Sequence, residues 1–224
     1  MYIEISNASS NCAADAEVNN PGAYFVTSVE LEIGGQKIDK HSGQWMETWA
    51  ELTEKNPSGT TASSTDMSSS TLFQRMSGMG GVIKNTTFNH IFIPLQFWFC
   101  RNPGLALPLI ALQYHEVKVI LEHTWDTGFN TAATNSLWCD YIYLDTDERR
   151  RFAQVSHEYL IEQVQEQTIN SLSQELNFNH PVKELIWTGI NKVKSWGGDI
   201  DTELLQLTAS VGSTYQLKLN GHDR

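Results

Sequence analysis

The stretch Val29-Glu30-Leu31-Glu32-Ile33-Gly34-Gly35 decides the fold class. Its apolar and acidic residues alternate, which places one set on each face of an extended strand, and a glycine pair of this kind is typical of a two-residue hairpin turn. The pattern predicts a half-buried strand that returns through Lys37-Ile38-Asp39. Tyr215–Gly221 repeats this shape near the end of the chain, which indicates two copies of one fold.

Short apolar or alternating segments recur between these two hairpins, and only one clear helical turn intervenes, at Thr146–Phe152. A parallel α/β fold would need helices between its strands, so the pattern predicts an all-β sandwich or barrel with short helices in its loops. The jelly roll is the commonest such form with long end loops. Further strands are expected at Phe88–Phe99, Leu107–Tyr114, Val117–Glu122, Trp138–Leu144, Glu158–Val164 and Val182–Ile190.

A short helix is expected after Ser42, whose hydroxyl can cap it. Trp45, Trp49 and Leu52 recur at helical spacing and are expected to pack onto the sheet. From Lys55 to Gly81 the composition shifts to Ser, Thr, Gly and Met with no period, which predicts a long surface loop.

Composition and charge exclude several classes of protein. The formal net charge of −11 disfavours non-specific binding to a phosphate backbone, so no direct nucleic-acid partner is expected. The start of the chain has no signal-peptide pattern, and polar residues and prolines interrupt the apolar stretch 91–121, so no transmembrane segment is expected. Cys12, Cys100 and Cys139 form no C-x-x-C pair and are interpreted as reduced, buried residues.

No motif in the chain predicts catalysis, a cofactor or a metal. His115-Glu116 lacks the second histidine of a zinc-protease motif, because Val119 stands at that position. In a cupin-like site a histidine and a carboxylate share one strand face, whereas the adjacent pairs His115-Glu116 and His157-Glu158 would point to opposite faces.

Two features remain as candidate contact or modification sites. Asn7 and Asn85 each begin an N-glycosylation sequon. Arg149, Arg150 and Arg151 follow three acidic residues, and they can either pair with these locally or contact another subunit.

The run Ile93–Val117 (IPLQFWFCRNPGLALPLIALQYHEV) resembles the most recognisable segment of major capsid proteins of nucleocytoplasmic large DNA viruses, of the type that infects algae. The resemblance continues in Val29–Lys40, Asp140–Phe152 and Leu217–Arg224 (LKLNGHDR), in the family's order. It implies a double jelly roll that forms homotrimeric, pseudo-hexagonal capsomers of an icosahedral capsid. It also implies a structural protein of the virion, not an enzyme, assembled in the host cytoplasm with neighbouring capsomers, minor capsid proteins and penton proteins.

Aligned with that family, the chain divides into three parts. Residues 1–165 are expected to form the first jelly roll without its N-terminal strands, 166–181 a linker, and 182–224 the opening strands of a second, truncated jelly roll. After Asn220-Gly221 only three residues follow, so the returning strand of that hairpin is expected to be missing. A carbohydrate-binding jelly roll and a cupin-type metalloenzyme stay open as alternatives. Exposed aromatics beside the end loops would favour the first, and bound metal the second.

Overall fold

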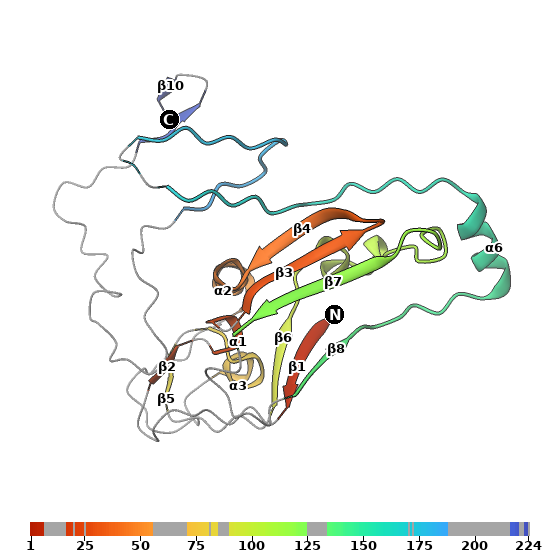
Figure 1. Ribbon diagram of the computed structural model, residues 1–224, viewed down its shortest axis with the longest axis horizontal. Coiled ribbons are helices and arrows are strands. Elements are labelled where there is room, and N and C mark those ends of the chain that lie inside the picture. The colour runs from red at the N-terminus through yellow and green to blue at the C-terminus, as the bar shows by residue number, and fades with distance from the viewer. Residues whose placement is uncertain are drawn as a thin grey trace.

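The computed structural model contains two three-stranded antiparallel sheets whose inner faces share one core (Figure 1). The structure describes residues 1–6, 17–19, 21–24, 26–55, 71–80, 82–84, 90–124, 134–169, 171, 173–187, 216–219 and 222–223. No helix within these ranges is long and apolar enough to cross a membrane.

The first sheet has the order β6-β1-β8, with β6 at His90–Pro94, β1 at Tyr2–Ser6 and β8 at Thr134–Trp138. Both pairings of β1 are antiparallel. The central strand alternates strictly, because Ile3 and Ile5 are buried while the residues on either side of them are only half-buried. One face of this sheet therefore lies on the core, and the other carries polar and aromatic side chains.

The second sheet has the order β4-β3-β7, with β4 at Gln36–Ser42, β3 at Val26–Ile33 and β7 at Val117–His123. Ile33 pairs with Gln36, so Gly34 and Gly35 alone make the turn, with φ angles of +61° and +80°. Positive φ at both central residues is the geometry of a tight hairpin that matches strand twist. The predicted hairpin and its glycine turn are confirmed.

The two sheets meet in a core of aliphatic side chains closed at one end by aromatic rings. Phe97 follows β6 and is fully buried, and its ring stacks on Phe99 at 5.8 Å between centroids. Burying such side chains is the main favourable term in folding, at about 1.5–3 kcal/mol each. The fully buried apolar side chains shared between the sheets include Ile5, Val29, Leu31, Ile91, Ile93 and Phe97.

Two further strand pairs are small. Glu17–Asn19 (β2) pairs with Val82–Lys84 (β5), and Lys218–Leu219 (β9) pairs with His222–Asp223 (β10), both antiparallel. The expectation that the last hairpin lacks a returning strand is wrong, because His222 lies opposite Leu219. Two residues suffice for one antiparallel rung, which is why the short tail still pairs.

The helix predicted after Ser42 is confirmed as α2, Gly43–Thr53, and the Ser42 hydroxyl accepts a hydrogen bond from the Trp45 N–H at 3.2 Å. The predicted packing face is partly wrong. Met46 and Ala50 are buried together with Gly43, whereas both indoles are half-buried and Leu52 is 58% exposed. Gly43 lies so close to the backbone of Ala23 and Val26 that a Cβ there would clash, and this approach turns the helix face with Met46 and Ala50 inward.

The long loop expected from Lys55 to Gly81 contains a second helix. Leu72–Ser77 (α3) begins with a capping box between Thr71 and Gln74, and ends at Gly78 in the left-handed conformation. Glu47 of α2 accepts hydrogen bonds from the Gly80 N–H, which holds the end of this segment against α2. The Thr-x-x-Gln sequence signals such a helix start, and composition alone had obscured it. Residues 56–70 lie outside the described part of the chain.

Several predicted strands are shorter than expected or absent. β6 ends at Pro94, and Trp98–Arg101 (α4) and Pro103–Leu105 (η2) are helical. Residues 107–114 form turns, residues 139–144 are extended without a sheet partner, and residues 158–164 are also outside any sheet. Residues 182–187 form no strand, and 188–190 lie outside the described residues. Pro103 and Pro108 each lack an N–H donor, which explains why an apolar run breaks into turns. Within the described ranges the remaining helices are Pro21–Tyr24 (α1) and Thr146–Gln154 (α6).

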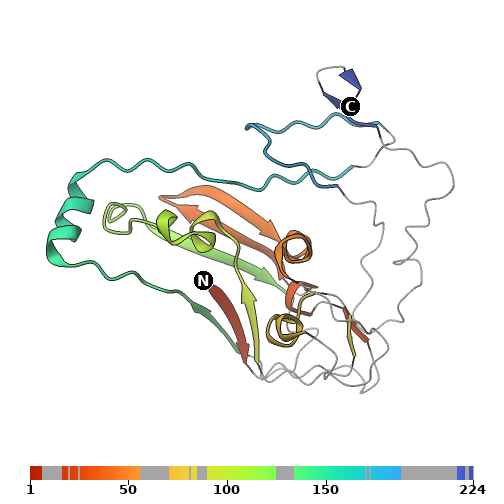
Figure 2. The ribbon, with the colours of Figure 1, turned by 180° about the vertical axis from the view of Figure 1, so that it is seen from behind.

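An extended segment returns from α6 and passes along the outer side of β4 (Figures 1 and 2). We call residues 161–166 the strap. Val164 N–H donates to Oδ1 of Asp39 at 3.0 Å, and the side chain of Gln163 donates to the Ile38 carbonyl. Further along, Gln165 and Gln167 accept hydrogen bonds from the backbone N–H groups of Asn179 and Asn177, so residues 174–183 fold back antiparallel to the strap.

Candidate functional site

The helix α6 is largely exposed and lies at the end of two extended segments (Figure 1). Asp145 caps it, with Oδ1 accepting the Glu148 N–H at 2.9 Å. Asp147 and Glu148 lie in the first turn and Arg151 in the last, an order that suits the helix dipole. None of its residues is buried, so sequence-local interactions and not packing hold this helix.

The three arginines have different surroundings. Arg149 donates from Nε to the Leu144 carbonyl at 3.1 Å and lies over the Tyr143 ring at 5.0 Å. Arg150 approaches Asp147 at 3.5 Å, where both side chains are well exposed, so that ion pair contributes little. Arg151 makes no ion pair with the described residues. The triad therefore presents cationic groups to solvent on an otherwise acidic chain.

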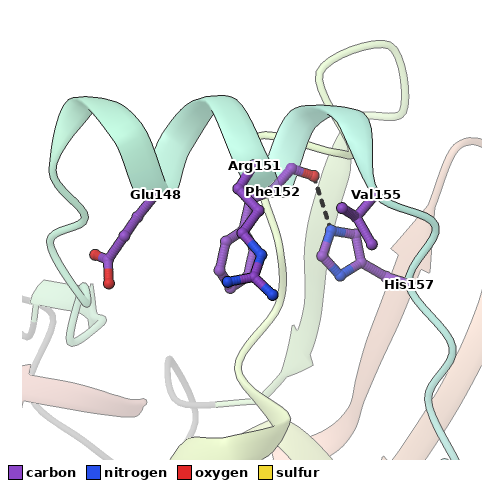
Figure 3. A pocket seen from close by; sticks show the side chains of 5 residues that line it. All are labelled: Glu148, Arg151, Phe152, Val155 and His157. Carbon is purple, nitrogen blue, oxygen red and sulfur yellow. Dashed lines mark hydrogen bonds between the residues drawn. The ribbon is translucent and has the colours of Figure 1, made fainter.

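A shallow pocket of about 150 Å³ lies at the C-terminal end of α6. Figure 3 shows Arg151 and Phe152 projecting from the helix on the side where His157 lies. A ring nitrogen of His157 lies 2.8 Å from the Phe152 carbonyl oxygen, and the two rings stack at 5.1 Å. Glu148 and Val155 complete the lining. The pocket is lined by one cation, one carboxylate, one aliphatic side chain and two rings.

A second exposed surface lies on the outer face of the β6-β1-β8 sheet. The Glu4 carboxylate accepts hydrogen bonds from Trp138 Nε1 at 2.6 Å and from Ser6 at 3.1 Å, and it pairs with His90 Nδ1 at 2.9 Å. The Tyr2 ring stacks on the Trp138 indole at 6.3 Å between centroids. Register explains the cluster, because Tyr2 lies opposite Trp138.

The hydrogen bond from Trp138, followed by that from His90, holds the pKa of the Glu4 carboxyl below its ordinary value of 4.5. The Glu4 carboxyl is therefore ionised at neutral pH, and its hydrogen-bond donors stabilise the negative charge. Trp138 is 51% exposed, and Trp187 is also exposed, whereas Trp98 is buried and Trp45 and Trp49 are half-buried. Trp98 is therefore a core residue, whereas Trp138 and Trp187 are surface residues.

The residues considered for catalysis make contacts that support the fold. His115 lies against Gly34, and the Glu116 carbonyl accepts the Gly34 N–H at 2.9 Å, so this pair supports the hairpin turn. Glu116 also pairs with Lys118 at 3.2 Å. Burial raises the pKa of the Cys100 thiol, which makes it a poor nucleophile. Within the described ranges no three His, Cys, Asp or Glu side chains gather into a group that could hold a metal ion.

Two candidate modification sites cannot be placed. Asn7 and Asn85 lie outside the described residues, as do Trp125 and Trp196. Cys100 and Cys139 are free thiols.

Comparison with known proteins assigns this arrangement to a family. Residues 2–145 match the family model of the major capsid protein N-terminus, and residues 148–224 match that of the large eukaryotic DNA virus major capsid protein. The chain belongs to the major capsid proteins of large eukaryotic DNA viruses. The family expected from the Ile93–Val117 run is confirmed.

Individual major capsid proteins agree with this assignment. The major capsid protein of Pyramimonas orientalis virus is 50% identical over 220 residues, covering 91% of this chain and 50% of that protein. Capsid protein 1 of Acanthamoeba polyphaga mimivirus is 41% identical, covering 82% of this chain and 34% of its own length. The chain thus spans half or less of the length of these relatives.

A solved structure agrees with the fold. The quasi-atomic model of the PBCV-1 virus capsid matches 72% of this chain and 39% of its own chain, with a TM-score of 0.52 and 35% identity. That capsid protein is a double jelly roll, so the predicted fold class of a jelly-roll β-sandwich is confirmed.

Proposed function

We propose that the chain is the structural part of a major capsid protein that assembles as a homotrimer into pseudo-hexagonal capsomers of an icosahedral DNA virus shell. Membership of the capsid family is the observation that carries this proposal. In this role the protein is a component of the virion, assembled in the host cytoplasm, and its partners are itself, neighbouring capsomers, minor capsid proteins and penton proteins.

The mechanism of such a protein is assembly without chemistry, so we propose that it is not an enzyme. Among the residues considered for catalysis, His115 lies against the hairpin turn and Glu116 pairs with Lys118. The fold offers a rigid two-sheet body, which suits a shell that must keep its shape. We also retain the proposed division into a first jelly roll at 1–165, a linker at 166–181 and the opening of a second at 182–224.

We propose that Arg149, Arg150 and Arg151 contact a neighbouring subunit. Arg151 supports this best, because it is a cation without an ion pair among the described residues, beside the half-buried rings of the pocket, in a chain of net charge −11. An acidic surface of another copy is a complementary partner for it. Asn7 and Asn85 stay proposed glycosylation sites.

Light scattering coupled to size-exclusion chromatography tests both proposals on the intact protein. A stable trimer supports the capsomer assignment, and a monomer at micromolar concentration contradicts it. Arg151→Glu is expected to weaken the trimer at least about tenfold, the range for reversing a charge at an interface. Arg75→Glu is the matched control, since Arg75 is an exposed arginine in the last turn of α3. A trimer unaffected by Arg151→Glu removes the contact proposal but leaves the trimer proposal standing.

Carbohydrate binding is the second candidate function, and the exposed Trp138 ring beside Glu4 is the observation that favours it. Sugars stack on exposed indole faces and donate hydroxyl hydrogen bonds to carboxylates. Titration with soluble chitohexaose and maltohexaose, followed by tryptophan fluorescence, tests it. Saturable quenching that Trp138→Ala abolishes and Trp187→Ala preserves would support this function, and no saturable change with either sugar would count against it.

A further inference from the structure

One side of β4 has no strand partner among the described residues, because β4 is the outer strand of the β4-β3-β7 sheet. An uncovered edge carries free N–H and C=O groups that can pair with a strand of another chain. In this structure the strap, residues 161–166, lies along that edge, as the hydrogen bonds of Gln163 and Val164 show.

The strap runs parallel to β4. Its contacts progress in the same direction on both segments, from Ile38 with Gln163, through Asp39 with Val164, to Ser42 with Glu166. The last of these joins the Ser42 hydroxyl to Oε2 of Glu166 at 3.0 Å. Each of these contacts involves at least one side chain, so the strap covers the edge without becoming a sheet strand.

Asp39 is the buried centre of this arrangement. Its side chain is 1% exposed and that of His41 is 2% exposed. Oδ1 of Asp39 accepts both the Lys40 N–H of β4 and the Val164 N–H of the strap at 3.0 Å, while Oδ2 lies 3.0 Å from His41 Nε2. The His41 ring is in turn fixed by stacking on Phe97 at 4.7 Å.

We infer that the strap closes the β4 edge against strand pairing with a second copy of this chain, and that the Asp39 carboxylate is the group that holds the strap closed. The Asp39 carboxylate replaces the carbonyl of a partner strand, because it accepts hydrogen bonds from the Lys40 N–H of the edge strand and from the Val164 N–H of the strap. Because the carboxylate is buried, loss of the Val164 donor would remove one of its three polar partners at a site closed to water, which favours the closed state.

Other contacts hold the start of the strap and must be separated from this anchor. Glu162 pairs with Arg101 at 2.9 Å and with Lys183, and Ile161 packs against the core. The pairing with Lys183, followed by that with Arg101, lowers the pKa of Glu162. Glu162 and Lys183 are exposed, and Ile161 lies at the start of the strap, so a change at Val164 tests the buried anchor without altering these contacts.

Val164→Pro removes the N–H donor and keeps an extended backbone. Leu160→Pro is the matched control, because Leu160 is 90% exposed and its N–H has no hydrogen bond to the described residues. Hydrogen exchange measured by mass spectrometry on the intact protein is expected to be roughly tenfold faster across 161–168 in Val164→Pro than in Leu160→Pro, the ratio for losing a hydrogen bond to a charged acceptor. Light scattering is expected to show larger species in Val164→Pro alone.

Equal exchange in the two proline variants would overturn the inference. If Val164→Pro fails to fold, hydrogen exchange of the unmodified protein is the test, since strap amides that exchange as fast as an unstructured peptide rule out a closed strap.

Asp39→Asn tests the role of the carboxylate. It is expected to speed strap exchange less than Val164→Pro, because the amide oxygen can still accept one hydrogen bond. Exchange in Asp39→Asn equal to that of the unmodified protein would show that the charge has no role. If Val164→Pro speeds strap exchange but light scattering shows no larger species, the inference that the strap prevents strand pairing with a second copy would be overturned.

Discussion

The indole Nε1 of Trp138 donates a 2.6 Å hydrogen bond to Oε2 of Glu4, which ties the last residue of β8 to the middle of β1. His90 of β6 approaches the other oxygen of the same carboxylate. One side chain thus joins all three strands of this sheet on its outer face. Such cross-strand contacts add to sheet stability, and they make the sheet sensitive to the charge of Glu4.

Glu4→Gln is expected to destabilise the protein at neutral pH and to have a smaller effect in acid. The pKa of Glu4 is lowered in the folded state, so its contribution is complete above the ordinary glutamate pKa and is lost as the pH falls through the lowered value. Urea unfolding midpoints at pH 7 and pH 3 measure this, with Glu158→Gln as an exposed control. A Glu4→Gln effect that stays constant between the two pH values would contradict the assignment.

Gly34→Ala is expected to destabilise the protein more than Gly35→Ala. Both glycines have positive φ, which strains an alanine by roughly 1–2 kcal/mol. A Cβ on Gly34 would also lie 2.6 Å from Nδ1 of His115, whereas one on Gly35 meets no atom within 4 Å. Chemical denaturation of both variants measures the difference. In the double variant Gly34→Ala with His115→Ala, the excess cost should disappear, and an unchanged excess would show that the contact is not its cause.

The alternation of apolar and polar residues and the choice of turn residues allowed the clearest structural predictions from the sequence. The Val29–Gly35 pattern predicted its strand, turn and returning strand, because few structures other than a hairpin combine a two-residue alternation with a glycine pair. The strand expected at Leu107–Tyr114 failed because apolar composition without alternation does not separate strands from turns rich in proline. The expected helix after Ser42 formed, but its buried face depends on how closely Gly43 approaches neighbouring backbone, which no local pattern encodes.

The surfaces were harder to predict than the fold. The Arg149–Arg151 run was visible as charge, and the structure adds that Arg151 borders a pocket. The Glu4 cluster and the Asp39 anchor join residues more than 80 positions apart, so only the pairing of distant segments brings them together. The sequence did contain a signal for Asp39, because an acidic residue between the apolar and basic residues of a strand needs hydrogen-bond donors if it is buried.

Phe97→Ala is expected to cost about 3–5 kcal/mol of unfolding free energy, the range for deleting a fully buried aromatic ring. Phe97 is fully buried and stacks on both His41 and Phe99. Phe99→Ala is the matched control, and its cost should be smaller because Phe99 is only half-buried. Equilibrium denaturation of the two variants measures the difference, and equal costs would mean that Phe97 is not central to the shared core.

Asp145→Ala is expected to loosen α6 without affecting the rest of the fold. The Asp145 carboxylate caps the helix through the Glu148 N–H, and an N-cap of this kind contributes about 1 kcal/mol. Because no residue of α6 is buried, packing cannot compensate for that loss. Amide exchange within 146–154 should therefore rise roughly fivefold, the ratio that corresponds to about 1 kcal/mol. Asp147→Ala removes an exposed ion pair and one first-turn charge but leaves the cap in place, so it should raise exchange less than Asp145→Ala. If both variants exchange alike, the cap does not set the stability of α6.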